Sequence, residues 1–275
     1  MDNNIHTFTA PSAEFPDYFD GANIRSAVDF KIATARPYLV KGMLLEGQVS
    51  LLCGPPNTGK TAVAASIAAH VARGMDMGRR RVRKGGVFYI AAEDATGVLE
   101  RAYPFMNGSG ERPGAFMVSG KPIDLRDGSD VASLIRWIES WKKAEGHERV
   151  MVFVDTLNLS VGDGDENSAR DMSRAIGNAQ LIAQRTRAHV MIVAHVPVAD
   201  KGRPRGSTAL EGNCDTVLIL RKHEGDSMDR NIVHVMPSKQ RSMPKVQTVS
   251  FELVAETVGA DEDGEAITVA KALLL

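Results

Sequence analysis

The sequence predicts an α/β fold, in which a mainly parallel β-sheet is flanked by helices and extended at its C-terminal end by antiparallel strands. Short apolar runs alternate with longer segments whose apolar residues recur at helical spacing. Strands that are apolar on both faces need cover on both faces, which is typical of parallel sheets between helices. From about residue 217 onward, strand-like runs follow one another with short turns and no helical pattern between them, which indicates the antiparallel extension.

The expected elements follow in order along the chain. Buried strands are predicted at 49–53, 86–91, 150–154 and 190–194. Helices are predicted at 61–73, from about 96, at 131–144 and at 168–186. The first helix has one apolar face, made of Val63, Ala64, Ile67, Ala68 and Val71. The extension is expected to contain strands at 217–220, 232–236, 246–253 and 266–271.

Composition limits the class of protein. The 275 residues include 33 Lys and Arg against 34 Asp and Glu, and this balance argues against a protein that coats nucleic acid, although a local basic patch is compatible with it. Two cysteines, Cys53 and Cys214, suit a reducing compartment. The chain has no apolar run of the ~20 residues that span a membrane and no signal-peptide core, so we expect a cytoplasmic protein without membrane contact. Residues 1–35 are expected to form a flexible or loosely docked leader, and 36–275 one domain.

Residues 54–61 match the phosphate-binding pattern G-x-x-x-x-G-K-[ST] at every fixed position. The loop follows an expected buried strand and opens an expected helix, so glycines and helix N–H groups would surround a phosphate. Lys60 is expected to reach the β- and γ-phosphates, and the Thr61 hydroxyl to hold Mg²⁺. We therefore predict that ATP and Mg²⁺ bind here; a chance glycine-rich turn is the alternative. The predicted nucleotide-binding residues are Gly54, Pro55, Pro56, Asn57, Thr58, Gly59, Lys60, Thr61 and Ala62.

Two acidic residues follow other expected strands. Asp155 ends the apolar run 150–154 and is predicted to bind the Mg²⁺ together with Thr61, unless it is only a turn or cap residue. Hydrolysis also needs a base for the attacking water, and Thr156, not an acid, follows Asp155. Glu93 at the end of the strand 86–91 is the natural candidate. The alternative is a role as helix cap, which Asp94 fits better.

His195 ends the strand predicted at 190–194. A polar residue at the carboxyl end of a parallel strand points into the crevice where ligands bind. It is therefore expected to sense the γ-phosphate by hydrogen bonding. An ordinary turn histidine is the alternative.

Several short segments together resemble the RepA-type ATPases, which are RecA-fold hexameric replicative helicases of plasmids and phages. They are 37–42 before the phosphate-binding loop, 91–94, 155–157, 164–167 and His195. The resemblance covers roughly residues 36–255. It implies a RecA-like P-loop NTPase core, assigns Glu93 as the catalytic glutamate, and implies that the His195 strand lies between the strands that end at Gly54 and Asp155.

Residues 238–244 resemble the Lys-x-Arg segment on a late hairpin of RecA-fold helicases, which reaches the nucleotide of a neighbouring subunit. The resemblance assigns Lys239 and Arg241 to this role. A guanidinium inserted from outside would stabilise the charge that spreads over the γ-phosphate during transfer. A solvated hairpin tip is the alternative.

Basic residues mark two further segments. Lys201, Arg203 and Arg205 lie among Gly and Pro after the His195 strand, in the loop that binds single-stranded DNA in RecA-type proteins. They are predicted to contact DNA phosphates, although the loop lacks aromatic residues for base stacking. A solvated loop is the alternative. The run 79–84 is denser but is expected to be a solvated face, with nucleic-acid binding as the alternative. The acidic loop 162–167 is not expected to contact phosphate and is assigned no chemical role; capping of the helix that opens near Ser168 is one interpretation.

The expected function is Mg²⁺-dependent ATP hydrolysis between the subunits of a homo-oligomer, with a hexameric ring favoured, in a DNA helicase or replication motor. Two alternatives remain at this point. One is a regulatory or assembly protein that uses ATP as a switch and unwinds nothing, and the other is a recombination-type filament ATPase. The sequence does not choose among ring, filament and smaller oligomer, or give the polarity of movement.

Overall fold

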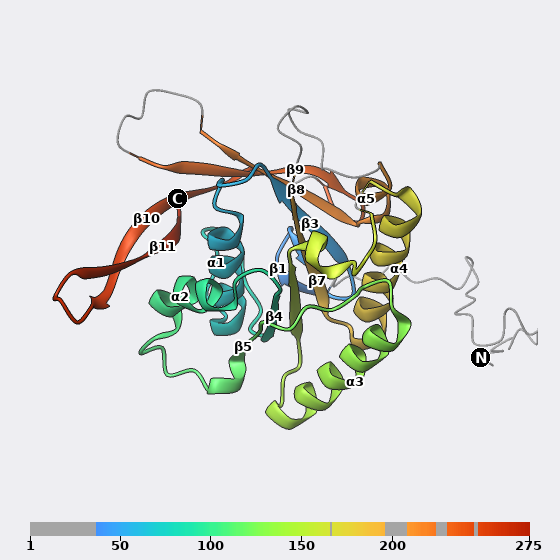
Figure 1. Ribbon diagram of the computed structural model, residues 1–275, viewed down its shortest axis with the longest axis horizontal. Coiled ribbons are helices and arrows are strands. Elements are labelled where there is room, and N and C mark those ends of the chain that lie inside the picture. Colours follow the sequence, from blue (N-terminus) through green and yellow to red (C-terminus); the bar gives the residue numbers. More distant parts are fainter. Residues whose placement is uncertain (1–36, 166, 196–207, 224–229, 245–246) are drawn as a thin grey trace, which may run out of the picture. The chain divides into compact units, whose positions relative to one another are not determined.

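A computed structural model describes residues 37–165, 167–195, 208–223, 230–244 and 247–275. Within these ranges the main sheet has nine strands in the order β11-β10-β9-β8-β3-β7-β6-β4-β5 (Figure 1). The strands are β3 (Val49–Gly54), β4 (Gly86–Ala91), β5 (Phe116–Ser119), β6 (Val150–Asp155), β7 (His189–His195), β8 (Thr216–Lys222), β9 (Ile232–Gln240), β10 (Val249–Ala260) and β11 (Ala266–Leu274). Two short antiparallel strands, β1 (Tyr38–Val40) and β2 (Leu44–Leu45), precede them.

Helices lie on both faces of the sheet (Figure 1). They are α1 (Lys60–Arg73), α2 (Ala95–Met106), α3 (Gly128–Glu145), α4 (Ala169–Thr186) and the short α5 (Thr208–Asn213), with 3-10 turns at Pro113–Ala115 and Leu157–Ser160. Helices α1 and α3 both end at a glycine with positive φ, Gly74 and Gly146, where a left-handed residue accommodates the turn. In the described ranges we find no helix whose length and apolar content would let it cross a membrane.

Each central strand supplies alternate side chains to two hydrophobic cores. Along β6, Val152 and Val154 pack into the core under α3 and α4, whereas Met151 and Phe153 pack into the core under α1 and α2. All of these side chains are fully buried. This two-sided burial is the reason why the strands are apolar at every position, and it confirms the predicted sheet between two helical layers.

The parallel part of the sheet contains β3, β4, β5, β6, β7 and β8. Strand β7 lies between β3 and β6, as the resemblance implied. The prediction that the run 217–220 opens the antiparallel extension is wrong, because β8 pairs with β3 in parallel, from Ser50↔Thr216 to Cys53↔Ile219. Helix α5 precedes β8 and allows a crossover connection, so the antiparallel part begins at β9.

His189 is a buried titratable group at the start of β7. Its side chain is fully buried, with Nδ1 2.7 Å from the Leu45 carbonyl oxygen and Nε2 2.8 Å from Ser50 Oγ. The carbonyl only accepts, so the neutral ring donates from Nδ1 and accepts the Ser50 hydroxyl at Nε2. Burial lowers the pKa of His189 from 6.5 to about 4.

This histidine makes the stability of the protein depend on pH. Between pH 6.5 and about 4 the unfolded His189 takes up a proton that the folded one refuses, so its stabilising contribution is complete above pH 6.5 and falls with decreasing pH. From His189 alone, we expect the free energy of unfolding to decrease by ~1.4 kcal/mol for each unit by which the pH falls within this window. Urea unfolding of the wild type and of His189→Gln at several pH values measures this pH dependence. If the free energy of unfolding of the two proteins changed with pH in parallel, the prediction would be contradicted.

Candidate functional site

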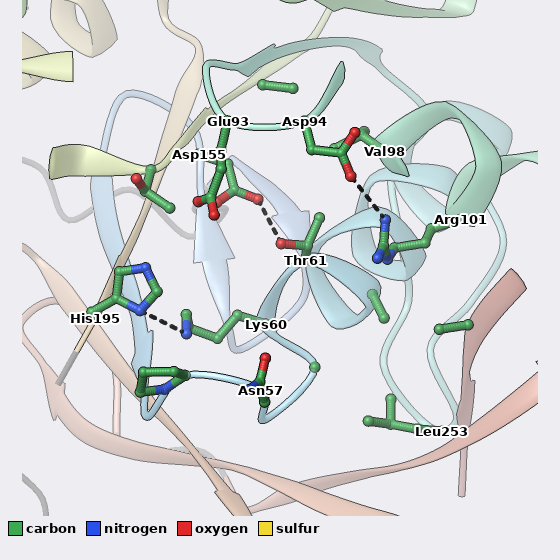
Figure 2. Close-up of a pocket in the computed structure, with 16 residues that line it drawn as sticks. Asn57, Lys60, Thr61, Glu93, Asp94, Val98, Arg101, Asp155, His195 and Leu253 are labelled. Carbon is green, nitrogen blue, oxygen red and sulfur yellow. Dashed lines mark hydrogen bonds and ion pairs between the residues drawn. The ribbon is translucent and has the colours of Figure 1, made fainter. Parts of the chain in front are cut away.

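A pocket of about 360 Å³ opens at the carboxyl ends of the parallel strands (Figure 2). The register explains why residues far apart in sequence meet there. Gly54 at the end of β3 pairs with His195 at the end of β7, and Ala91 at the end of β4 pairs with Asp155 at the end of β6. Of the predicted site residues, those that line the pocket are Pro56, Asn57, Gly59, Lys60, Thr61, Ala62, Glu93, Asp155 and His195.

The predicted phosphate-binding loop is a tight turn from β3 into α1. Thr58 donates its hydroxyl to the Pro55 carbonyl oxygen at 2.8 Å, which closes the turn. Gly59 has a φ of +84°, and a Cβ at this position would collide with the Leu253 side chain, so a glycine is required there. No side chain caps the start of α1, and its first N–H groups are therefore available to an anion.

Lys60 is held inside the loop. Its ammonium donates to the carbonyl oxygens of Gly54 and Pro55 at 3.1 and 3.0 Å and lies 3.2 Å from His195 Nδ1 (Figure 2). Burial lowers the pKa of Lys60, and the nearby carboxylates of Asp155 and Glu93 oppose this shift. The geometry places one cation where the strand, the loop and His195 converge.

Asp155 and Thr61 form a polar pair beside Lys60. The Thr61 hydroxyl donates to Asp155 Oδ2 at 3.1 Å (Figure 2), and the buried Tyr89 hydroxyl donates to the same oxygen at 2.6 Å. Burial raises the pKa of Asp155, whereas the two hydroxyl donors lower it. A hydroxyl and a carboxylate are oxygen ligands that suit Mg²⁺, which keeps several waters and binds through few protein groups. The described residues contain no cluster of three or more His, Cys, Asp or Glu that could hold a metal ion.

Glu93 and Asp94 are adjacent but have different surroundings. Asp94 Oδ1 accepts the Gly97 N–H at 2.7 Å and caps α2, as expected. Asp94 also lies 3.7 Å from Arg101. Glu93 is exposed at the pocket and has no hydrogen bond or ion pair with any residue that the structure describes.

Lys239 and Arg241 do not line the pocket of their own chain. Lys239 donates to the carbonyl oxygens of Glu211 and Gly212, both at 2.7 Å, at the end of α5. Arg241 donates to the Gly212 carbonyl oxygen at 3.1 Å and lies 3.4 Å from Asp215, with its side chain 51% exposed. The structure therefore places both cations together on an outer face and not at the Lys60 pocket.

The remaining predicted segments have mixed outcomes. Lys201, Arg203 and Arg205 lie outside the described residues. The interpretation that the acidic loop 162–167 caps α4 is wrong, because Ser168 itself accepts the Asp171 N–H. Asp163 of that loop instead pairs with Arg126, which is close to Asp171 as well.

Some residues of the site were not anticipated. Tyr89 lies in a buried strand, and its hydroxyl in an otherwise apolar run was the available signal for a polar partner. Arg101 on α2, and Leu253 and Ala270 on the C-terminal strands, also line the pocket. Nothing in the local sequence indicated these three, because they reach the pocket through tertiary packing of α2 and the hairpin β10–β11.

Comparisons with known proteins agree with this architecture. The family model described as AAA domain, AAA_25, matches residues 23–201, more than half of the chain. None of the curated proteins that were compared matches this chain.

Two solved structures share the fold. One is described as an ATPase domain, and it has a TM-score of 0.55 at 18% identity, over 82% of this chain and 86% of that one. The other, a KaiC-like protein from the hyperthermophilic archaeon Pyrococcus horikoshii, has a TM-score of 0.52 at 16% identity, over 84% and 93% of the two chains. The family match shows that the chain belongs to the AAA_25 family, and the two structures show that it has a RecA-like P-loop NTPase fold.

Proposed function

We propose that this protein hydrolyses ATP with Mg²⁺ at the Lys60 pocket. The observation that carries the proposal is the convergence of Lys60, Thr61, Asp155 and Glu93 from three separate segments on one loop–helix junction. Loop N–H groups and Lys60 would bind the phosphates, and Thr61 and Asp155 would hold Mg²⁺, which when bound neutralises phosphate charge. Tyr89 positions Asp155 by its hydrogen bond.

Glu93 is the base in this proposal. It accepts a proton from the water that attacks the γ-phosphorus, while the bond from the γ-phosphorus to its bridging oxygen breaks. His195, which lies 3.2 Å from the Lys60 ammonium, links the state of the phosphate-binding lysine to β7. Loss of the γ-phosphate would alter the contacts of both side chains.

We further propose that hydrolysis takes place between subunits of a homo-oligomer, with a hexameric ring favoured, in the cytoplasm. Support comes from the position of Lys239 and Arg241, which lie on an outer face away from their own pocket. From there they would reach the nucleotide of a neighbouring subunit and stabilise the transferring phosphoryl group. The segment with Lys201, Arg203 and Arg205 would bind single-stranded DNA, and the assembly would act as a helicase or replication motor.

A nucleotide-dependent switch that unwinds no DNA is the second candidate. It is favoured by the observation that Lys239 and Arg241 already have hydrogen-bond partners in their own subunit. One experiment separates the two: the ATPase rate with and without single-stranded DNA, measured alongside native mass. Stimulation by DNA in a hexamer supports the motor, DNA-independent turnover in a small oligomer supports the switch, and the absence of ATP hydrolysis under both conditions would overturn the proposed activity.

A further inference from the structure

The hairpin formed by β10 and β11 carries a concentration of acidic side chains at its end. Its strands run past the helices and away from the sheet (Figure 1). All ten residues 259–268 are exposed, and the turn contains Asp261, Glu262, Asp263 and Glu265. Asp261 Oδ1 accepts the backbone N–H groups of Asp263 and Glu265, which gives the turn a defined shape. None of the four carboxylates forms an ion pair within the described ranges.

A second exposed surface carries the opposite charge. The run 79–84 is not a loose loop, because Val82 bridges to Val40, Arg83 N–H donates to Leu39 and Lys41 N–H donates to Arg81. The side chains Arg79, Arg81, Arg83 and Lys41 are exposed and form no ion pair with any described residue. Lys41, Arg79 and Arg80 line a pocket of about 500 Å³. We call the pocket that Lys41, Arg79 and Arg80 line the basic pocket.

The acidic turn cannot reach the basic pocket of its own chain. The pocket includes Leu274 at one end of β11, and the turn precedes Ala266 at the other end. Eight residue steps of extended strand separate these ends by ~27 Å. The two surfaces are therefore available to each other only between two copies of the chain.

The hairpin that carries the acidic turn lines both pockets. Leu253 and Ala270 line the Lys60 pocket, whereas Ser250 and Leu274 line the basic pocket. Gln240, directly before Arg241, donates to the carbonyl oxygens of Gly42 and Met43 at 3.1 and 3.3 Å, and Gly42 lines the basic pocket. The end of β9, directly before Arg241, therefore contacts the segment that lines the basic pocket.

We propose that the acidic turn of each subunit docks in the basic pocket of the next copy of this chain. Repeated contacts between two different surfaces generate a ring or a filament. A second copy is favoured over nucleic acid as the partner because the chain itself carries the complementary charge at a defined turn, and its overall charge is close to neutral at 33 against 34. The inference rests on the assembly in the proposed function.

Charge reversal tests the contact. The tip variant is Glu262→Lys with Asp263→Lys and Glu265→Lys, which keeps Asp261 because it shapes the turn. The pocket variant is Lys41→Glu with Arg79→Glu, two exposed residues that line the basic pocket, and it keeps Arg80 because Arg80 donates to the Gln247 carbonyl oxygen. Each should raise the concentration for half-assembly by on the order of 10-fold or more in native-mass or sedimentation measurements with Mg²⁺ and a non-hydrolysable ATP analogue.

The decisive sample carries the tip changes and the pocket changes in one chain. Because both charges are then reversed, the turn and the pocket should attract each other again. Recovery of assembly there, with weakening by salt in the wild type, supports the contact and also shows that the variants fold. Arg136→Glu and Glu139→Lys on the exposed face of α3 are the matched controls and should assemble normally.

Normal assembly of the tip variant, or a pocket variant that loses only single-stranded DNA affinity, would overturn the inference and leave the proposed function intact. A wild type that hydrolyses ATP as a monomer at all concentrations would overturn the inference together with the proposed assembly.

Discussion

Lys60→Ala subunits are expected to hydrolyse ATP no faster than background. The ammonium is the one cation of the described residues that lies within the phosphate-binding loop, 3.0 Å from the Pro55 carbonyl oxygen and 3.2 Å from His195. Its removal takes away the positive charge that would stabilise the β- and γ-phosphates during transfer. A steady-state phosphate-release assay with saturating Mg²⁺ and ATP measures the effect.

The fold should survive this change, because Lys60 bonds only to loop carbonyls and His195 among the partners described above. Lys143→Ala, at an exposed position on α3, is the matched control and should retain full activity. Wild-type turnover by Lys60→Ala would show that the loop 54–61 is not where ATP is hydrolysed.

Glu93→Gln subunits are expected to bind ATP normally and to hydrolyse it ~10²–10⁴-fold more slowly. The amide fits the space of the carboxylate at the pocket but cannot accept a proton from water. Binding of a fluorescent ATP analogue and single-turnover hydrolysis measure the two effects separately, so a loss of chemistry can be told from a loss of affinity.

Asp94→Asn is the natural comparison, because it changes the adjacent carboxylate in the same way. Asp94 caps α2 through the Gly97 N–H, and an asparagine also caps, so this variant should keep both its stability and its turnover. The roles of the two residues would be reversed if Asp94→Asn were inactive and Glu93→Gln active.

The sheet could be predicted from sequence where burial is two-sided, and it could not where strands are short or half-exposed. Runs such as 150–154 are apolar throughout because both faces are covered, which makes them visible without the structure. Strand β5 is half-exposed along most of its length at the sheet edge, and β2 has only two residues. Neither strand therefore shows a periodic pattern of apolar residues that would predict it. The parallel pairing of β8 depends on α5, whose six residues are too few for a helical pattern.

Some residues of the site could also be predicted from sequence, and others could not. Lys60, Thr61, Glu93, Asp155 and His195 were predictable because each sits at the end of a strand or in the loop that follows one, and parallel strands end at one edge. Arg101 and Leu253 come from a helix and from a strand about 150 residues further on, and only their packing brings them to the pocket. A cation that serves another subunit does not line the pocket of its own subunit. The role proposed for Arg241 therefore depends on the resemblance and on the position of Arg241 on an outer face.

Two subunits complete each nucleotide site in the proposed function, and mixing inactive variants is the test of this arrangement. Arg241→Ala subunits should bind ATP but hydrolyse it slowly, by a factor on the order of 10³, because the missing guanidinium belongs to the neighbouring site. Lys60→Ala subunits lack a working pocket but still carry Arg241. In mixed oligomers, some sites have an intact Lys60 on one side and an intact Arg241 on the other, and activity should return in part.

The double variant, Lys60→Ala with Arg241→Ala in one chain, is the control and should stay inactive at every protein concentration. Native mass must show that the two single variants assemble together. We expect ATP turnover in that mixture to exceed the sum of the turnover of the separate variants. Turnover equal to that sum, in oligomers shown to contain both subunits, would contradict this arrangement.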